Sequence, residues 1–256
     1  MNLQFKDVII HNHIMTYYPN KSVGWGNVAL CLSDLMHRSP KPVVHSSIFD
    51  VERDVDLIGF EITDSTDDEP FDARLVINPF YFQNVHKNLK DIVKPNNNLQ
   101  KLIDENEHGL EYGLHIRRGA CSKDSEHIGC HGKDEEGKIK PAYFAQDSAV
   151  QKFINVVDKT NAKFFLATDS TEIKHMFKER FPDKIVTVDH QPTLSYDCVT
   201  LQNKGASRTD AYLDWFLLSK CKNIYITAGN EDLTDFSTFG YSAGAYGGSN
   251  IHFIFN

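Results

Sequence analysis

Two adjacent arginines, Arg117 and Arg118, directly follow an apolar run in the segment 112–119, which reads YGLHIRRG. The run predicts a buried strand, so both guanidinium groups should lie at its carboxyl end, where open α/β sheets bind ligands. A guanidinium stays charged and donates two parallel hydrogen bonds, which suits a diphosphate. The simpler alternative is that both arginines pair with surface carboxylates, but the preceding His115 and the strand context favour an anion site.

Short apolar segments alternate with helical patterns along the chain, most regularly in its second half. This alternation is typical of β-α units and a parallel sheet, so we expect an α/β fold. Segments 95–98 and 104–109 are polar and turn-rich, and we place a lobe boundary near Asn106. The expected strands are 7–10, 42–44, 74–77, 112–116, 163–167, 184–188, 223–227 and 251–255, and the expected helices are 26–38, 83–92, 142–159, 170–181 and 207–221.

Four separate parts of the chain carry motifs that together resemble one family. They are the pattern His-x-Arg-Arg at 115–118, GWGNVA at 24–29, FFLATD at 164–169, and DAYLDWFLLS at 210–219 followed by FSTFG at 236–240. In order, spacing and expected context they resemble the superfamily of α-1,2-, α-1,6- and protein O-fucosyltransferases. Each motif alone is a weak signal, so the inference depends on their combination.

The resemblance implies an α/β, GT-B-like fold, in which two Rossmann-like lobes with parallel sheets enclose a cleft. Residues 1–105 would form the acceptor-side lobe, and residues 106–256 the nucleotide-sugar-binding lobe. The implied activity is inverting transfer of L-fucose from GDP-fucose to a hydroxyl group of a glycan or glycoconjugate. The resemblance implies no required cofactor and no metal.

The same resemblance assigns roles to the residues around the arginine pair. Arg117 would contact the donor diphosphate and stabilise the charge that grows on the leaving group, so it is a catalytic candidate. His115 would contact the nucleoside side, and Arg118 would support either the loop or the phosphate. Asp214 would accept hydrogen bonds from N1 and N2 of guanine.

Further donor-site candidates lie at the starts of expected helices. Ser237 and Thr238 match the position at which the family binds phosphate with a hydroxyl and backbone amides. Gly26 and Asn27 belong to a glycine-rich loop that faces the cleft in the family. Asp169 ends the second donor-site strand, although capping of the following helix would also explain an aspartate there.

A long polar loop at 121–140 is expected to contribute the general base. In one branch of the family, a carboxylate about ten residues beyond the motif histidine has this role. Glu126 is the nearest candidate, with Asp124 beside it. The chain departs from the family where Gly119 and Ala120 replace the acid that commonly follows the arginines, so the donor sugar or the handling of the acceptor would differ.

Composition narrows the possible partners and the compartment. The formal net charge of -8 argues against a general nucleic-acid binder. No apolar run reaches the roughly 20 residues needed to span a bilayer, so we expect no membrane span. The five cysteines are odd in number and scattered, and no charged-then-apolar leader occupies residues 1–10. These features favour reduced thiols and a cytoplasmic location.

Four other functions compete with the fucosyltransferase hypothesis. One is a transferase of the same fold that takes another nucleotide sugar, of the GDP-mannose, GDP-rhamnose or UDP-xylose type. Another is a non-catalytic nucleotide- or carbohydrate-binding module that keeps the fold. A glycoside hydrolase needs a carboxylate pair, and context singles out none. A zinc site would draw on Cys121, His127, Cys130 and His131, whose spacing matches no familiar finger.

Overall fold

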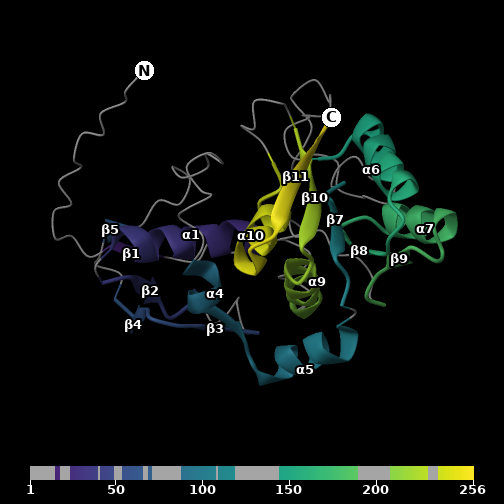
Figure 1. Ribbon diagram of the computed structural model, residues 1–256. Coiled ribbons are helices and arrows are strands. Elements are labelled where there is room, and N and C mark those ends of the chain that lie inside the picture. The colour runs from purple at the N-terminus through teal and green to yellow at the C-terminus, as the bar shows by residue number, and fades with distance from the viewer. Residues whose placement is uncertain are drawn as a thin grey trace, which may run out of the picture.

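The computed structural model describes residues 15–17, 24–39, 41–48, 54–65, 69–70, 88–107, 109–118, 144–189, 208–229 and 236–256. Within these residues the chain is a mixed α/β protein with two separate parallel sheets, as Figure 1 shows. The expected α/β fold class is therefore confirmed. In the part of the chain that is described, no helix is both long enough and apolar enough to cross a membrane.

The larger sheet has five parallel strands in the order β11-β10-β7-β8-β9. From β7 the chain proceeds outward through β8 and β9, and it then returns to the other side of β7 to form β10 and β11. This reversal makes the carboxyl ends of β7 and β10 a topological switch point, where open α/β sheets bind ligands. The strands are β7 (Tyr112–Ile116), β8 (Phe164–Thr168), β9 (Ile185–Val186), β10 (Asn223–Ala228) and β11 (Asn250–Phe255).

Helices cover both faces of this sheet because successive strand residues point to opposite sides. Phe164 and Leu166 of β8 pack in a core with α6 and α7, whereas Phe165 and Ala167 pack in a second core with α9 and α10. The helix expected at 142–159 is confirmed over the residues of α6, where Ala149, Val150, Phe153, Ile154 and Val157 are buried at helical spacing. The helices are α6 (Asp147–Lys159), α7 (Thr171–Arg180), α9 (Thr209–Ser219) and α10 (Thr238–Gly247).

The amino-terminal part contributes a four-stranded parallel sheet in the order β4-β2-β1-β5, together with α1. A short antiparallel pair joins β3 to β6, and β6 directly follows α4 in the chain. The two larger sheets fall on either side of residue 106, but the exact lobe boundary stays a prediction. The elements are β1 (Met15–Tyr17), α1 (Trp25–Arg38), β2 (Val43–His45), β3 (Val55–Leu57), β4 (Glu61–Thr63), β5 (Glu69–Pro70), α4 (Leu89–Ile92) and β6 (Val93–Pro95).

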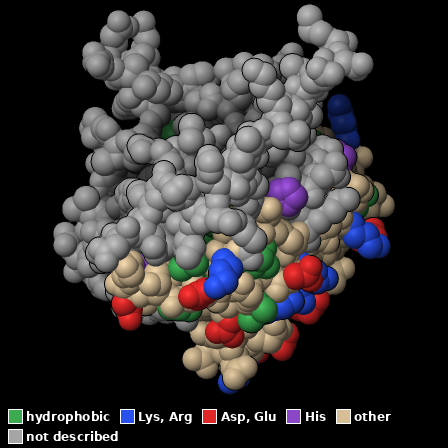
Figure 2. Space-filling model, turned by 90° about the vertical axis from the view of Figure 1, so that its left-hand side faces the viewer, with side chains coloured by type: hydrophobic (Ala, Val, Ile, Leu, Met, Phe, Trp, Pro, Cys, Tyr) green, Lys and Arg blue, Asp and Glu red, His purple; other side chains and the backbone are tan. Residues whose placement is uncertain are grey.

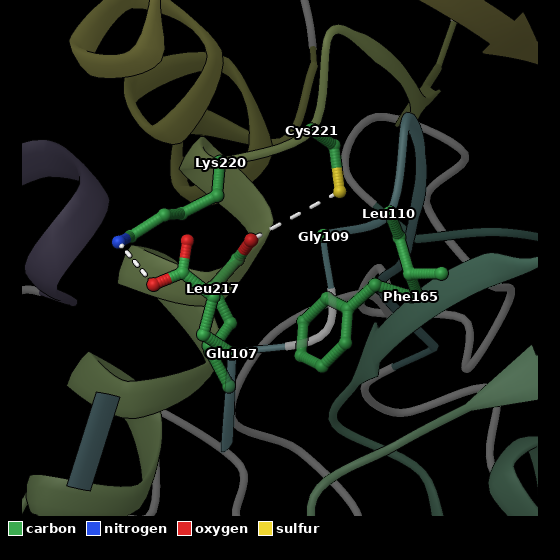
Figure 3. A pocket seen from close by; sticks show the side chains of 7 residues that line it. All are labelled: Glu107, Gly109, Leu110, Phe165, Leu217, Lys220 and Cys221. Atoms are coloured by element: carbon green, nitrogen blue, oxygen red, sulfur yellow. Dashed lines mark hydrogen bonds and ion pairs between the residues drawn. The ribbon is translucent and has the colours of Figure 1, made fainter. Parts of the chain in front are cut away.

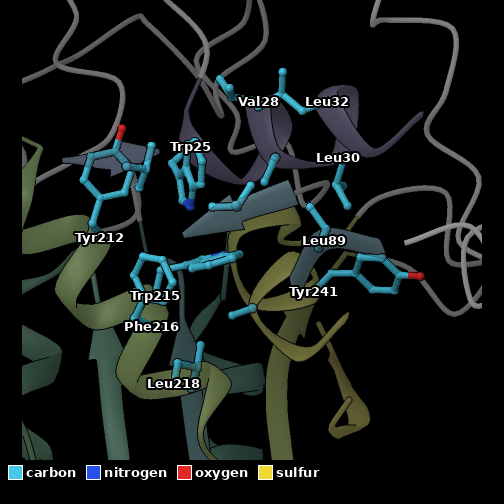
Figure 4. Close-up of a cluster of buried hydrophobic side chains, with 14 of the residues drawn as sticks. Trp25, Val28, Leu30, Leu32, Leu89, Tyr212, Trp215, Phe216, Leu218 and Tyr241 are labelled. Atoms are coloured by element: carbon cyan, nitrogen blue, oxygen red, sulfur yellow. The ribbon is translucent and has the colours of Figure 1, made fainter. Parts of the chain in front are cut away.

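An aromatic cluster joins α1 to the carboxyl-terminal helices. Trp25 packs edge-on against Tyr212 and Trp215 of α9, with ring centroids 4.9 Å and 5.6 Å apart, as Figure 4 shows. Edge-to-face aromatic pairs each contribute about 0.5–1.5 kcal/mol beyond the burial of their area. The start of α1 is therefore held firmly against α9 and α10, although these elements are far apart in the sequence.

One expectation about local structure is wrong. Segments 95–98 and 104–109 were expected as polar turns, but residues Asn97–Asn106 form a helix, α5. The side chain of Asn96 caps this helix by accepting a hydrogen bond from Leu99 N, and Leu99 and Ile103 bury one narrow face. Two apolar positions four residues apart suffice for an otherwise polar helix when a neighbouring element covers them. The strands expected at 7–10 and 74–77 lie outside the described residues.

Candidate functional site

Most of the predicted site residues meet at the switch point of the five-stranded sheet. Because the strands are parallel, the ends of β7, β8 and β10 lie along one edge. His115 is the second-last residue of β7, and Arg117 and Arg118 lie just beyond the strand. Asp169 follows β8, and Ser237 and Thr238 begin the helix after β10. The sequence therefore brings these side chains to the edge where a ligand is expected.

Thr227 fastens this edge together, and sequence reasoning gave it no role. Its fully buried hydroxyl accepts a hydrogen bond from Arg117 N at 3.1 Å and donates one to His115 O at 3.3 Å. Its carbonyl accepts from Ser237 N at 2.9 Å. One residue of β10 thus fixes the backbone of both the arginine motif and the start of α10.

Arg118 is engaged in contacts that organise the surrounding chain. Its backbone N–H donates to Asp169 Oδ1 at 2.6 Å, and its guanidinium donates to Ala145 O at 2.7 Å and pairs with Asp147. Asp169 therefore orients the arginine motif, and the side chain that caps the following helix belongs to Ser170. The capping alternative for Asp169 is thus wrong.

Arg117 packs against a segment that is distant in sequence. Its guanidinium carbon is 5.2 Å from the ring centre of Phe144, and only 8% of the residue is exposed. Asn256 holds this segment in place, because its amide donates to Phe144 O at 3.1 Å and accepts from Gln146 N at 2.8 Å. Stacking on the ring face orients the guanidinium plane, which determines where its edge can donate hydrogen bonds.

His115 is a buried, neutral imidazole beside this arginine. Burial, reinforced by the charge of Arg117, lowers the pKa of His115 to about 3. The ring stacks on Phe239 with centroids 4.9 Å apart. Among the described residues, its Nδ1 atom has no hydrogen-bond partner. A buried nitrogen of this kind is expected to find a partner, and a bound ligand can supply one.

Glycine at position 240 is required by this arrangement. A Cβ there would lie 3.0 Å from His115 Nδ1 and 2.7 Å from a methyl carbon of Ile226. A larger side chain would therefore displace the imidazole ring. Close packing against His115 and Ile226 therefore explains why the FSTFG segment ends in glycine.

Two helix amino termini converge at the same place. A Cβ on Gly26, in the first turn of α1, would lie 2.4 Å from Phe239 N in the first turn of α10. Neither helix start has a side-chain cap or an acidic residue in its first turn. The fully buried Ser237 Oγ also has no hydrogen-bond partner within the described ranges. Two uncapped, positively polarised helix ends beside an arginine favour an anion.

The remaining predicted site residues are Asn27, Asp214 and Glu126. Asn27 is half-buried in the first turn of α1, next to the contact just described. Asp214 is buried on α9, where it lies within electrostatic range of Lys174. Glu126 falls outside the described residues, as do the four possible zinc ligands of the long loop. Over the ranges that the structure covers, no cluster of three or more His, Cys, Asp or Glu residues is arranged to hold a metal ion.

A separate small cavity lies at the opposite, amino-terminal edge of the sheet. Its volume is about 20 Å³, and its lining includes Glu107, Leu217 and Cys221, as Figure 3 shows. That volume accommodates about one water molecule and excludes a nucleotide. Burial raises the pKa of the Cys221 thiol to about 12, so this thiol is not a ready nucleophile.

The surface charge is mixed where it is described. In the view of Figure 2, Lys and Arg side chains lie interspersed with Asp and Glu over the described part of the face.

Comparisons with known proteins identify the fold. No family model and no curated protein sequence matches the chain. A point mutant of FUT1 from Arabidopsis thaliana, solved in complex with GDP, is similar in structure at 13% identity with a TM-score of 0.53, covering 94% of this chain and 70% of that one. Fucosyltransferase NodZ from Bradyrhizobium matches at 15% identity with a TM-score of 0.48, covering 90% and 92%. The match to FUT1 shows that this chain has an α/β, GT-B-like fold like that of this fucosyltransferase, which is the fold that its motifs predict.

Proposed function

We propose that the protein is an inverting glycosyltransferase that transfers L-fucose from GDP-fucose to a hydroxyl group of a glycan acceptor. The observation that carries the proposal is the meeting of two uncapped helix starts with Arg117 and a buried neutral histidine at the switch point. The plant fucosyltransferase of the same fold was solved with GDP, which supports a guanine nucleotide as the ligand.

The site suits a diphosphate on electrostatic grounds. Backbone N–H groups at the start of α10, next to Ser237 and Thr238, would donate to phosphate oxygens, and the first turn of α1 at Gly26 and Asn27 would add its positive end. Arg117 would supply the full positive charge. His115 is neutral at working pH, so its role would be a directed hydrogen bond to the nucleoside side of the donor.

The proposed reaction develops negative charge where these donors converge. As the bond between the anomeric carbon and the β-phosphate oxygen breaks, the bonding electron pair remains on that oxygen. Arg117 and the helix starts would stabilise it without a metal ion. The acceptor hydroxyl would attack from the opposite face of the sugar, which inverts the configuration, and its proton would pass to a general base. Glu126 stays the candidate for that base.

Other residues of the edge would act by positioning. Thr227 holds the backbone on either side of the motif, and Asp169 holds the backbone N–H of Arg118. The guanidinium of Arg118 holds the segment that carries Phe144 beneath Arg117. Preorganised donors need no rearrangement during the reaction, and this is the source of their catalytic value.

The proposal is tested by calorimetric titration of GDP, UDP, GDP-fucose and GDP-mannose in buffer with a chelator and no added divalent metal. Wild type should bind GDP and GDP-fucose, and Arg117→Ala should bind both at least about tenfold more weakly. Arg180→Ala is the matched control, because Arg180 is exposed on α7 and paired with Asp158. Stronger binding of UDP, or equal binding by Arg117→Ala, would contradict the proposal.

A second measurement separates an enzyme from a binding module that kept the fold. Incubation of the protein with GDP-fucose alone should release GDP through slow transfer of fucose to water, and Arg117→Ala should lose this release. Tight binding of GDP-fucose without any GDP release would favour the binding module. Faster GDP release from GDP-mannose would instead indicate a different donor sugar.

A further inference from the structure

The peptide group that joins Ile116 to Arg117 is held from both sides by threonine hydroxyls. On one side, Thr168 Oγ1 of β8 donates a hydrogen bond to Ile116 O at 2.7 Å. On the other side, Thr227 Oγ1 of β10 accepts one from Arg117 N at 3.1 Å. The carbonyl and the N–H of a trans peptide group point in opposite directions, so each of them faces one of the two strands that flank β7.

These hydroxyls take the place of backbone groups where the strands stop pairing. The last position of β7 that pairs with β10 is His115, opposite Ile226. The last position that pairs with β8 is Ile116, opposite Thr168. Both threonines are buried, and a buried peptide group needs partners, which a hydroxyl can supply because it both donates and accepts. The β-branched side chain also restricts rotation about χ1, which keeps each hydroxyl in place.

Each threonine also ties this peptide group to the helix that follows its own strand. Thr168 Oγ1 accepts a hydrogen bond from Ser170 N at 3.2 Å, and Ser170 is the N-cap of α7. The carbonyl of Thr227 accepts one from Ser237 N at 2.9 Å, and Ser237 is the N-cap of α10. The backbone before Arg117 is therefore fixed relative to the two helix starts beside it.

We propose that Thr168 is a positioning residue that forms, with Thr227, a two-sided clamp directing Arg117 toward the donor diphosphate. The inference rests on the proposed function, in which Arg117 contacts that diphosphate. Rotation of the clamped peptide plane would change φ of Arg117, and with it the direction in which the long side chain leaves the sheet. A displacement of about 1 Å in a positioned group can reduce a rate about 10²-fold, so this direction matters for function.

The test measures GDP affinity by calorimetry in variants that remove one hydroxyl. Thr168→Val and Thr227→Val keep the branched shape, and each should bind GDP about tenfold more weakly than wild type. Thr168→Ser and Thr227→Ser keep the hydroxyl and should bind GDP within about threefold of wild type. Thr160→Val is the matched control, because it removes a hydroxyl that donates to Val156 O at 2.8 Å just before β8 begins, at the amino-terminal edge of the sheet. Its GDP affinity should equal that of wild type.

A double variant separates action through Arg117 from a purely structural role. In an Arg117→Ala background, adding Thr168→Val should change GDP affinity by less than about twofold, because the group that the clamp directs is gone. Thermal unfolding of every variant is measured in parallel, so that a loss of stability is not mistaken for a loss of binding. If Thr227→Val does not fold, the Thr168 variants alone decide the question, since Thr168 makes the separate bond to the carbonyl side of the peptide group.

The outcomes distinguish the inference from the function on which it rests. If wild type fails to bind GDP, the proposed function itself fails. If wild type binds GDP and Thr168→Val binds it equally well, only the clamp is overturned, even where the variant melts at a lower temperature. A tenfold loss from Thr168→Val in the Arg117→Ala background would also overturn it, because the hydroxyl would then act independently of Arg117. So would a serine variant that binds as weakly as the valine variant.

Discussion

The two edges of the five-stranded sheet differ in whether their buried polar side chains have hydrogen-bond partners. At the amino-terminal edge, Lys220 pairs with Glu107 at 3.0 Å, and the thiol of Cys221 lies 3.9 Å from Leu217 O. None of the residues that line the cavity there has a buried side-chain atom without a hydrogen-bond partner, as far as the described residues extend. At the carboxyl edge, by contrast, the buried atoms His115 Nδ1 and Ser237 Oγ have no hydrogen-bond partner among the described residues.

Buried polar atoms without a hydrogen-bond partner among the described residues therefore distinguish the carboxyl edge, where we propose that the donor binds, from the amino-terminal edge. Folding alone does not favour such atoms, because an unsatisfied buried group costs about 1–3 kcal/mol. Both edges contain glycines forced by close backbone approach, so a glycine contact by itself does not mark a site. Gly247 would place a Cβ 1.8 Å from Ser219 O, and Gly26 would place one 2.4 Å from Phe239 N.

The largest expected effect comes from breaking one glycine contact at each edge. Gly26→Ala should separate the starts of α1 and α10 and abolish measurable GDP binding, because both helix ends would leave the anion site. Gly247→Ala should lower the free energy of unfolding by about 1–3 kcal/mol, as overpacking does, but leave GDP affinity unchanged in the folded protein. Thermal unfolding and calorimetry well below the melting temperature measure the two quantities. Similar GDP affinity in the two variants would refute the distinction between the edges.

A smaller but purely chemical effect is expected at Arg117. Arg117→Ala should reduce the rate of GDP release from GDP-fucose about 10²–10³-fold, equivalent to about 2.7–4 kcal/mol in the barrier, because one preorganised donor to the leaving group is removed. Single-turnover release of GDP measures this rate at saturating donor. Arg180→Ala should keep the wild-type rate, and a normal rate in Arg117→Ala would remove this residue from the mechanism.

The sequence predicted the framework of this edge well because its signals are local. The strand expected at 112–116 is β7 itself, and those expected at 163–167 and 223–227 are one residue from β8 and β10. Arginines placed after a buried strand necessarily lie at the carboxyl edge of the sheet. The side chains beyond the strand ends were therefore brought together as expected.

What the sequence could not supply depends on contacts between distant residues. The role of Thr227 follows from the register of β10 against β7, and the placement of Phe144 depends on Asn256, 112 residues away. Asp169 and Ser170 are equally good helix caps by type, and only the position of Arg118 N decides between them.

An effect of intermediate size is expected on acidification, which should destabilise the protein through His115 at the carboxyl edge. His115 has a folded-state pKa of about 3 and an ordinary value of 6.5, so the unfolded chain binds more protons between these limits. The contribution of His115 to the unfolding free energy should therefore be complete above pH 6.5. Below pH 6.5 the unfolding free energy should fall by about 1.4 kcal/mol per pH unit. Denaturant unfolding of wild type and His115→Gln between pH 7 and pH 5 isolates this group by difference. Parallel pH profiles for the two proteins would show that the imidazole is not held neutral.

The smallest effect is expected where the amino-terminal edge meets solvent. Lys220 and Glu107 are each nearly half exposed, so their ion pair is screened and should contribute about 0.2–1 kcal/mol. Glu107→Gln should therefore change the unfolding free energy by no more than this, and that change should shrink further at high salt. GDP affinity should not change, because the pair lies at the opposite edge from the helix starts. A tenfold loss of GDP affinity in Glu107→Gln would mean that the two edges are coupled through the sheet, and the carboxyl edge would then no longer be a self-contained site.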